Sequence, residues 1–166
     1  MAGKAGVVFV CTGNICRSPT AEGMFLHKVA KAGLSHDIEV DSAGTHGYHV
    51  GEAPDPRSVK HAALRGYDLS PLRARRFDKG DFHRFDLVLA MDEGHHDHLS
   101  RLMQPSHGQK LGHKLKMMMG YSDKYRASHR EVPDPYYGGP EGFEHVLDLL
   151  DDATDGLLRE LRSMIR

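Results

Sequence analysis

The chain has no tryptophan, only two cysteines and no apolar run long enough to form a membrane-spanning helix. Cys11 and Cys16 lie too close together to staple a secreted fold, so the sequence favours a reduced, cytoplasmic setting. The first residues lack the apolar core of a signal peptide, although export without a signal would leave no such trace. The formal net charge is −1 at pH 7, which argues against general nucleic-acid binding. Neither membrane insertion nor a nucleic-acid partner is therefore expected.

Motifs for metal ions and nucleotide cofactors are also lacking. The chain has 13 histidines, and three of them cluster at His95, His96 and His98. On a helix, His95 and His98 share a face without an obvious third ligand, so no metal site is predicted. The glycine-rich G-x-G-x-x-G pattern of dinucleotide-binding proteins does not occur, and no cofactor is expected.

Short apolar runs alternate with helical patterns along the chain. Strands are predicted at residues 6–10, 38–42, 85–91 and 115–119, and helices at residues 20–32, 56–65, 93–103 and 141–165. This alternation indicates an α/β fold, with a four-stranded parallel sheet and helices on both faces. The 166 residues fit a single domain over 1–166, with a core of about 6–166. Ligands of such sheets bind beyond the carboxyl ends of the strands.

The end of the first predicted strand carries the most reactive group of side chains. Residues 11–19 read Cys-Thr-Gly-Asn-Ile-Cys-Arg-Ser-Pro and lead into a predicted helix. The unpaired N–H groups and the dipole of a helix N-terminus favour anions, including a thiolate at Cys11. Gly13 and Asn14 tolerate the left-handed backbone of a tight cradle, and Arg17 offers two parallel N–H bonds to phosphate oxygens. A thiol nucleophile inside a phosphate cradle indicates a phosphatase.

Ser18 and Cys16 each allow two interpretations. Ser18 before Pro19 predicts a helix cap, with Glu22 in the first turn, and its hydroxyl is also placed to donate to the Cys11 sulfur. Cys16 fits a small buried hydrophobe behind the loop. Alternatively, Cys16 captures an oxidised Cys11 as a reversible disulfide before further oxidation occurs, which is a hypothesis drawn from their shared loop.

Four segments of the chain resemble the low-molecular-weight protein tyrosine phosphatases. Residues 10–19 resemble the signature loop of that family, and Asp134-Pro135-Tyr136-Tyr137 resembles its general-acid loop. Residues 41–44 resemble the end of its second strand, and residues 85–92 resemble its third strand. The similarity extends from about Val7 to the last helix, in the order of the family. The resemblance implies hydrolysis of phosphotyrosine through a phosphocysteine intermediate.

The resemblance assigns roles to particular residues. Cys11 is expected to be the nucleophile, Arg17 to bind the phosphate and Asp134 to act as general acid and base. Ser42 is expected to bond Asn14 and support the loop. The remaining residues expected around the phosphate or the substrate ring are Thr12, Gly13, Asn14, Ile15, Cys16, Ser18, Tyr48, Tyr136 and Tyr137. The expected partner is a tyrosine-phosphorylated protein, with a tyrosine kinase as one candidate, and the expected state is a monomer or weak dimer.

One departure from the family and two alternative functions stay open at the level of sequence. The family often has a histidine that steadies the loop asparagine, where this chain has Leu72, so Asn14 must rely on Ser42 or on backbone groups. Related arginine phosphatases carry a small threonine where this chain has Ile15, and the bulkier side chain favours a flat ring over a branched guanidinium phosphate. The second alternative is a module that binds phosphotyrosine without turnover. The combination of Cys11, Arg17 and Asp134 argues against it.

Overall fold

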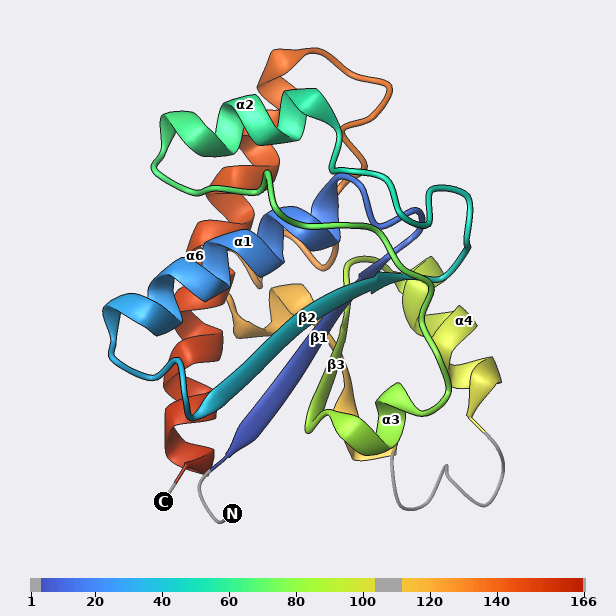
Figure 1. The fold of residues 1–166 in the computed structure, drawn as a ribbon, viewed down its shortest axis with the longest axis vertical. Coiled ribbons are helices and arrows are strands. Elements are labelled where there is room, and N and C mark those ends of the chain that lie inside the picture. Colours follow the sequence, from blue (N-terminus) through green and yellow to red (C-terminus); the bar gives the residue numbers. More distant parts are fainter. Residues whose placement is uncertain (1–3, 104–111, 166) are drawn as a thin grey trace.

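Four parallel strands form one sheet, whose order is β2-β1-β3-β4 (Figure 1). The computed structural model describes residues 4–103 and 112–165. The strands are β1 (Ala5–Cys11), β2 (Ile38–Gly44), β3 (Leu87–Ala90) and β4 (Leu115–Met117). All seven residues of β1 are buried, as expected for a central parallel strand that is covered on both faces. The predicted fold class is confirmed.

Helices cover both faces of the sheet. On one face lie α1 (Arg17–Lys31), α2 (Pro56–Leu64) and the long α6 (Pro140–Met164), and α1 packs against α6 (Figure 1). The other face is covered by α3 (Asp81–Arg84) and α4 (Glu93–Leu102). Alternate residues of β1 enter the two cores: Phe9 joins the core with α1 and α6, and Val10 joins the smaller core with Phe82 and Leu99. The hydrophobic alternation along β1 thus fixes which helices lie on each side.

The strand order reverses beside β1, and this reversal positions the site. The chain runs from β1 to β2 on one side and then returns to β3 on the other side of β1. Sheets of this kind bind ligands where the order reverses, beyond the carboxyl ends of the strands. Cys11 is the last residue of β1, so it lies at this point.

Two local predictions were wrong. The fourth strand does not continue to residue 119, because a 3-10 helix, η2 (Met118–Tyr121), begins after Met117. Successive strand residues point to opposite faces, whereas Met118 and Met119 both pack into the larger core, which the tight turn allows. A Cβ on Gly156 would lie 1.9 Å from the Tyr121 carbonyl oxygen, so only glycine lets α6 approach this turn.

The second error concerns the start of α1. Ser18 is not its cap: the helix begins at Arg17, and its N-cap residue, Cys16, makes no side-chain capping bond. The side chain of Ser18 is instead engaged by the loop. Glu22 therefore lies beyond the first turn, on the buried side of the helix. A short 3-10 helix, η1 (Gly112–Lys114), precedes β4.

Candidate active site

Residues 11–18, here called the phosphate loop, connect β1 to α1. Asn14 in this loop has φ of 60°, which makes it the one non-glycine residue with positive φ among residues 4–103 and 112–165. Asparagine tolerates this left-handed conformation better than most residues do. The Cys11 and Thr12 carbonyls accept hydrogen bonds from Thr45 N and His46 N at 2.8 and 3.1 Å. The loop is thereby tied to the segment that follows β2.

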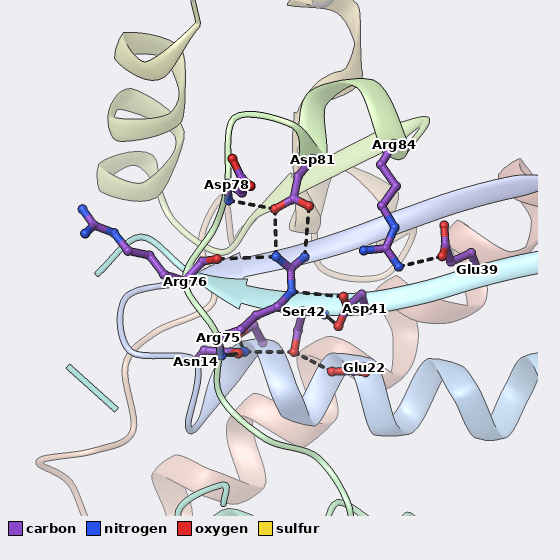
Figure 2. Close-up of polar contacts among 11 residues, drawn as sticks. Asn14, Glu22, Glu39, Asp41, Ser42, Arg75, Arg76, Asp78, Asp81 and Arg84 are labelled. Atoms are coloured by element: carbon purple, nitrogen blue, oxygen red, sulfur yellow. Dashed lines mark hydrogen bonds and ion pairs between the residues drawn. The ribbon is translucent and has the colours of Figure 1, made fainter. Parts of the chain in front are cut away.

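Three hydrogen bonds hold the buried side chain of Asn14. Its Nδ2 donates to Ser18 Oγ at 2.7 Å. The same nitrogen donates to Ser42 Oγ at 2.9 Å, and Oδ1 accepts from Arg75 N at 3.0 Å (Figure 2). The expected contact between Ser42 and Asn14 is confirmed. Because the side chain of Leu72 cannot form hydrogen bonds, Asn14 was expected to rely on Ser42 or on backbone groups, and the structure shows both, the backbone group being Arg75 N. Leu72 instead packs against the larger core.

Arg75 is clamped in place by two carboxylates from different elements. Its Nε lies 3.1 Å from Asp41 Oδ2 on β2, and its Nη1 lies 3.0 Å from Asp81 Oδ2 on α3 (Figure 2). In addition, Gly44 N donates to the Arg75 carbonyl at 2.8 Å. Arg75 therefore connects the phosphate loop to the sheet edge and to α3. Sequence reasoning missed this role, because nothing in the local sequence distinguishes Arg75 from its exposed neighbours.

The direction of these bonds orients the hydroxyl of Ser18 toward the thiol. An amide nitrogen can only donate, so Ser18 Oγ accepts from Asn14 and keeps its own proton. Cys11 Sγ lies 2.9 Å from Ser18 Oγ, within reach of that proton. The arrangement favours donation from the hydroxyl to a thiolate at Cys11. This agrees with the second interpretation of Ser18 drawn from the sequence.

Arg17 is buried and fixed by groups from two other segments. Its Nη1 donates to Asp92 Oδ2 at 2.8 Å and to the Val132 carbonyl at 3.0 Å. Its Nη2 lies 3.9 Å from Asp134 Oδ2. Burial alone would raise the pKa of Asp92, but the hydrogen bond from His95 N and the pairing with Arg17 outweigh it and lower that pKa. Asp92 therefore stays ionised beside Arg17, a partner that sequence reasoning missed.

The phosphate loop forms the base of a pocket of about 250 Å³. The pocket brings together the thiol of Cys11, the guanidinium of Arg17 and the carboxylate of Asp134. The residues that line it are Cys11, Thr12, Gly13, Ile15, Cys16, Arg17, Tyr48, His49, Asp134, Tyr136 and Tyr137. Asn14 and Ser18, expected around the phosphate, do not line the pocket: their side chains, like that of Ser42, are buried and support the loop from within. His49 is an additional lining residue that the sequence did not indicate.

Comparison with known proteins identifies the family of this chain. The chain matches the family described as low molecular weight phosphotyrosine protein phosphatase over residues 6–165. The chain belongs to this family. It is 45% identical over 159 residues to the low molecular weight protein-tyrosine-phosphatase of Streptomyces coelicolor, covering 96% of this chain and 94% of that one. A Synechocystis protein whose name assigns it to the same group is 50% identical over 155 residues, covering 93% and 95%.

Solved structures of related phosphatases have the same fold as this protein. The protein tyrosine phosphatase of Entamoeba histolytica superposes with a TM-score of 0.88 at 36% identity, covering 96% of this chain and 98% of that one. An arginine phosphatase from Drosophila superposes with a TM-score of 0.81 at 30% identity, covering 93% and 96%. The resemblance drawn from four short segments is thus confirmed over nearly the whole chain.

Aromatic side chains of the phosphatase surround the entrance of the pocket. Tyr48 is 70% exposed and stacks on His46, with ring centroids 5.1 Å apart and planes 10° from parallel. The guanidinium of Arg57 lies over the ring of Tyr136, 5.1 Å from the ring centroid. Tyr137 is 90% exposed. The walls are therefore suited to contact a flat apolar group above the polar base.

The loop that carries Asp134 and the second thiol both lie at the pocket. Asp134 is half exposed, and its Oδ1 accepts from Tyr136 N at 3.0 Å, which holds the carboxylate near the thiol and Arg17. Burial raises the pKa of Cys16 to about 12, against a smaller opposing effect of a hydrogen bond with Ser58. The Cys16 thiol therefore stays protonated at neutral pH.

A buried carboxyl group continues the support of the loop inward. Ser42 Oγ donates to Glu22 Oε1 at 2.5 Å, so Glu22 is connected to the phosphate loop through Ser42 and Asn14 (Figure 2). Glu22 is 8% exposed, and its burial raises its pKa from 4.5 to about 7 despite the hydrogen bond from Ser42. This chain therefore carries a titratable group behind its phosphate loop that changes charge near neutral pH.

The described residues also bear on two other kinds of feature, a membrane-spanning helix and a metal site. Over residues 4–103 and 112–165, no helix is both long and apolar enough to cross a membrane. Within the same residues, no group of three or more His, Cys, Asp or Glu side chains is arranged to hold a metal ion.

Proposed function

We propose that this phosphatase hydrolyses phosphotyrosine in proteins through a phosphocysteine formed on Cys11. In the first step the Cys11 thiolate attacks phosphorus, the bond to the tyrosine oxygen breaks and Asp134 gives a proton to the leaving phenolate. Arg17 and the N–H groups of the phosphate loop hold the three equatorial oxygens, where charge is spread in the transition state. The phosphoryl group then rests on sulfur.

In the second step water replaces the thiolate. Asp134, now ionised, takes a proton from the attacking water, the bond between sulfur and phosphorus breaks and inorganic phosphate leaves. The Ser18 hydroxyl, 2.9 Å from Cys11 Sγ, stabilises the departing thiolate. The enzyme returns to its starting state with no cofactor in either step.

The observation that carries this proposal is the meeting of three groups in one pocket. The thiol, guanidinium and carboxylate come from the end of β1, the start of α1 and a loop before α6, more than a hundred residues away in the chain. Binding of phosphotyrosine alone would require neither a thiol nor a carboxylate beside the phosphate. This favours turnover over the alternative of a binding module.

Phosphotyrosine is the favoured substrate because of the shape of the pocket. The pocket is lined by three aromatic rings that can contact a substrate ring, those of Tyr48, Tyr136 and Tyr137. Ile15, in the phosphate loop, lines the pocket and occupies space there. Phosphoarginine is the second candidate, and it is supported by the similarity to the Drosophila arginine phosphatase. A branched guanidinium phosphate would crowd Ile15, so phosphotyrosine is expected to react faster.

The cellular context of the proposal follows from sequence and family together. We expect a tyrosine-phosphorylated protein as substrate, with a tyrosine kinase as one candidate, a cytoplasmic location and a monomer or weak dimer. Sedimentation at several protein concentrations tests the last of these, and a stable higher oligomer would contradict it.

The direct test compares turnover of phosphotyrosine and phosphoarginine peptides by the wild type and by two variants. Cys11→Ser is expected to abolish turnover, and Asp134→Ala is expected to reduce kcat by about 10²-fold or more. Glu141→Ala, at the start of α6 and outside the pocket, serves as the matched control for removal of a carboxylate. Faster turnover of phosphoarginine would favour the second candidate, and no turnover of either peptide would contradict the proposal.

A further inference from the structure

His95 is a buried histidine beside the pocket that the proposed reaction does not use. It is the third residue of α4 and is 5% exposed, whereas the next residue, His96, is only partly buried. His95 Nε2 lies 2.8 Å from Thr12 Oγ1 in the phosphate loop and 3.5 Å from Arg17 Nη2. A single imidazole thus contacts both the loop and the phosphate-binding arginine.

The contacts at the other ring nitrogen determine which nitrogen carries the proton. His95 and Asp92 form a reciprocal capping box: His95 N donates to Asp92 Oδ1 at 2.9 Å, and Asp92 N donates to His95 Nδ1 at 3.2 Å. Nδ1 also lies 3.0 Å from Asp92 Oδ1, but its hydrogen bond in the capping box is with Asp92 N, which can only donate, so Nδ1 is the acceptor. In a neutral imidazole the proton then resides on Nε2, which donates to Thr12 Oγ1.

We propose that His95 is a positioning residue for phosphate binding, which holds the Thr12 hydroxyl as an acceptor and helps to fix Asp92, the partner of Arg17. Because Thr12 Oγ1 accepts from His95, the hydroxyl proton of Thr12 stays available for a phosphate oxygen in the pocket that Thr12 lines. The capping box fixes the ring through Asp92, which also binds Arg17 at 2.8 Å. His95 therefore couples the start of α4 to two phosphate-binding groups. The proposal rests on the phosphate-binding role given above.

The surroundings keep His95 neutral, as this role requires. Burial, together with the neighbouring charge of Arg17, lowers the pKa of His95 to about 4, against the opposing effects of Asp92 and Asp134. The ring of His46 adds to the lowering. A protonated imidazole would place a second cation against Arg17, whereas the neutral ring supplies a single directed donor.

The first test measures binding of inorganic phosphate by calorimetry, which requires no turnover. His95→Leu is expected to weaken phosphate binding about tenfold, because the orientation of Thr12 is lost and Asp92, the partner of Arg17, loses its contact with the imidazole. His95→Gln is the conservative variant: glutamine suits this position of a capping box, with one oxygen to accept from Asp92 N and one NH₂ to donate to Thr12. It is expected to bind phosphate within about threefold of the wild type. His96→Leu, the same change at the next residue, is the matched control.

The second test uses kinetics of a phosphotyrosine peptide together with a double-mutant cycle. His95→Leu is expected to lower kcat/KM, with partial rescue by His95→Gln, and to have little further effect in a Thr12→Ala background. An equal loss of kcat/KM in His95→Leu and His95→Gln would overturn the proposal. Effects of His95→Leu and Thr12→Ala on kcat/KM that are fully additive would also overturn it. So would a His95→Leu protein with reduced thermal stability but unchanged phosphate affinity, because that result assigns only a capping role. Phosphate binding that depends on His95 without any turnover would instead contradict the proposed function alone.

Discussion

The buried carboxyl group of Glu22 predicts a specific dependence of stability on pH. Its pKa rises from 4.5 to about 7 in the folded protein, chiefly because burial disfavours the charge. Between these values the folded state keeps a proton that the unfolded state releases, so the free energy of unfolding falls as pH rises through this window. The full shift in pKa corresponds to about 3 kcal/mol of unfolding free energy. The folded protein has lost all of this stability above about pH 7. Below pH 4.5 both states are protonated and the effect vanishes.

The substitution Glu22→Gln removes this titration and keeps the shape of the side chain. The glutamine still accepts from Ser42 and stays neutral at every pH. Relative to the wild type, the variant is therefore expected to gain up to about 3 kcal/mol of stability between pH 4.5 and pH 8. The relevant quantity is the change of this difference with pH, since any constant offset reflects the altered hydrogen bond alone.

Urea unfolding at pH 5, 6, 7 and 8, followed by circular dichroism, measures this difference; the chain has no tryptophan to serve as a fluorescent probe. Glu39→Gln is the matched control, on β2, the strand that also carries the Ser42 partner of Glu22. Glu39 is 44% exposed and paired with Arg84 (Figure 2), so its replacement is expected to cost less than about 1 kcal/mol at each pH. A stability difference between Glu22→Gln and the wild type that stays constant across this range would refute the reasoning.

Two further predictions concern the pocket and its second thiol. Because Cys11 lies at the base of the pocket, with 3% exposure, the short side chain of phosphoserine is expected not to reach it, and equal kcat/KM for phosphoserine and phosphotyrosine peptides would contradict this depth. Mild peroxide is expected to convert Cys11 to a sulfenic acid, which Cys16 attacks to give a disulfide and water. This step is expected to accelerate as pH rises, since the pKa of Cys16 is about 12, and mass spectrometry should show sulfinic acid accumulating in Cys16→Ser. Persistent sulfinic acid in the wild type, without a disulfide, would contradict the capture hypothesis.

The parts predicted well from sequence depend on local patterns. The alternation of apolar strands and amphipathic helices gives the parallel sheet, because each strand has to be buried on both faces. The phosphate loop is equally local: Cys11, Asn14 and Arg17 lie within seven residues, and the left-handed φ of Asn14 matches the tolerance of asparagine. Asp134 is distant in sequence, and its place at the pocket was anticipated through the resemblance rather than through any local signal.

The parts that sequence reasoning missed depend on contacts between distant segments. Asp92 and His95 reach Arg17 and Thr12 from α4, and Arg75 reaches Asn14 from the segment before α3. Asp92 directly precedes the helix predicted at residues 93–103, but nothing in the sequence tells which arginine its carboxylate will meet. The sequence pattern predicts that Ser18 caps a helix and that Glu22 lies in its first turn. The actual start at Arg17 places Glu22 inward, where Ser42 meets it.

The central claim is that Cys11 carries the phosphoryl group during turnover. The most direct measurement mixes the wild type with a phosphotyrosine peptide, quenches with acid at successive early times and locates the phosphoryl group by mass spectrometry. We predict a transient phosphoryl group on Cys11, which is absent in Cys11→Ser and accompanied by release of the dephosphorylated peptide. Turnover by the wild type with no phosphoryl group on Cys11 at any time, or with the group on another residue, would contradict the mechanism.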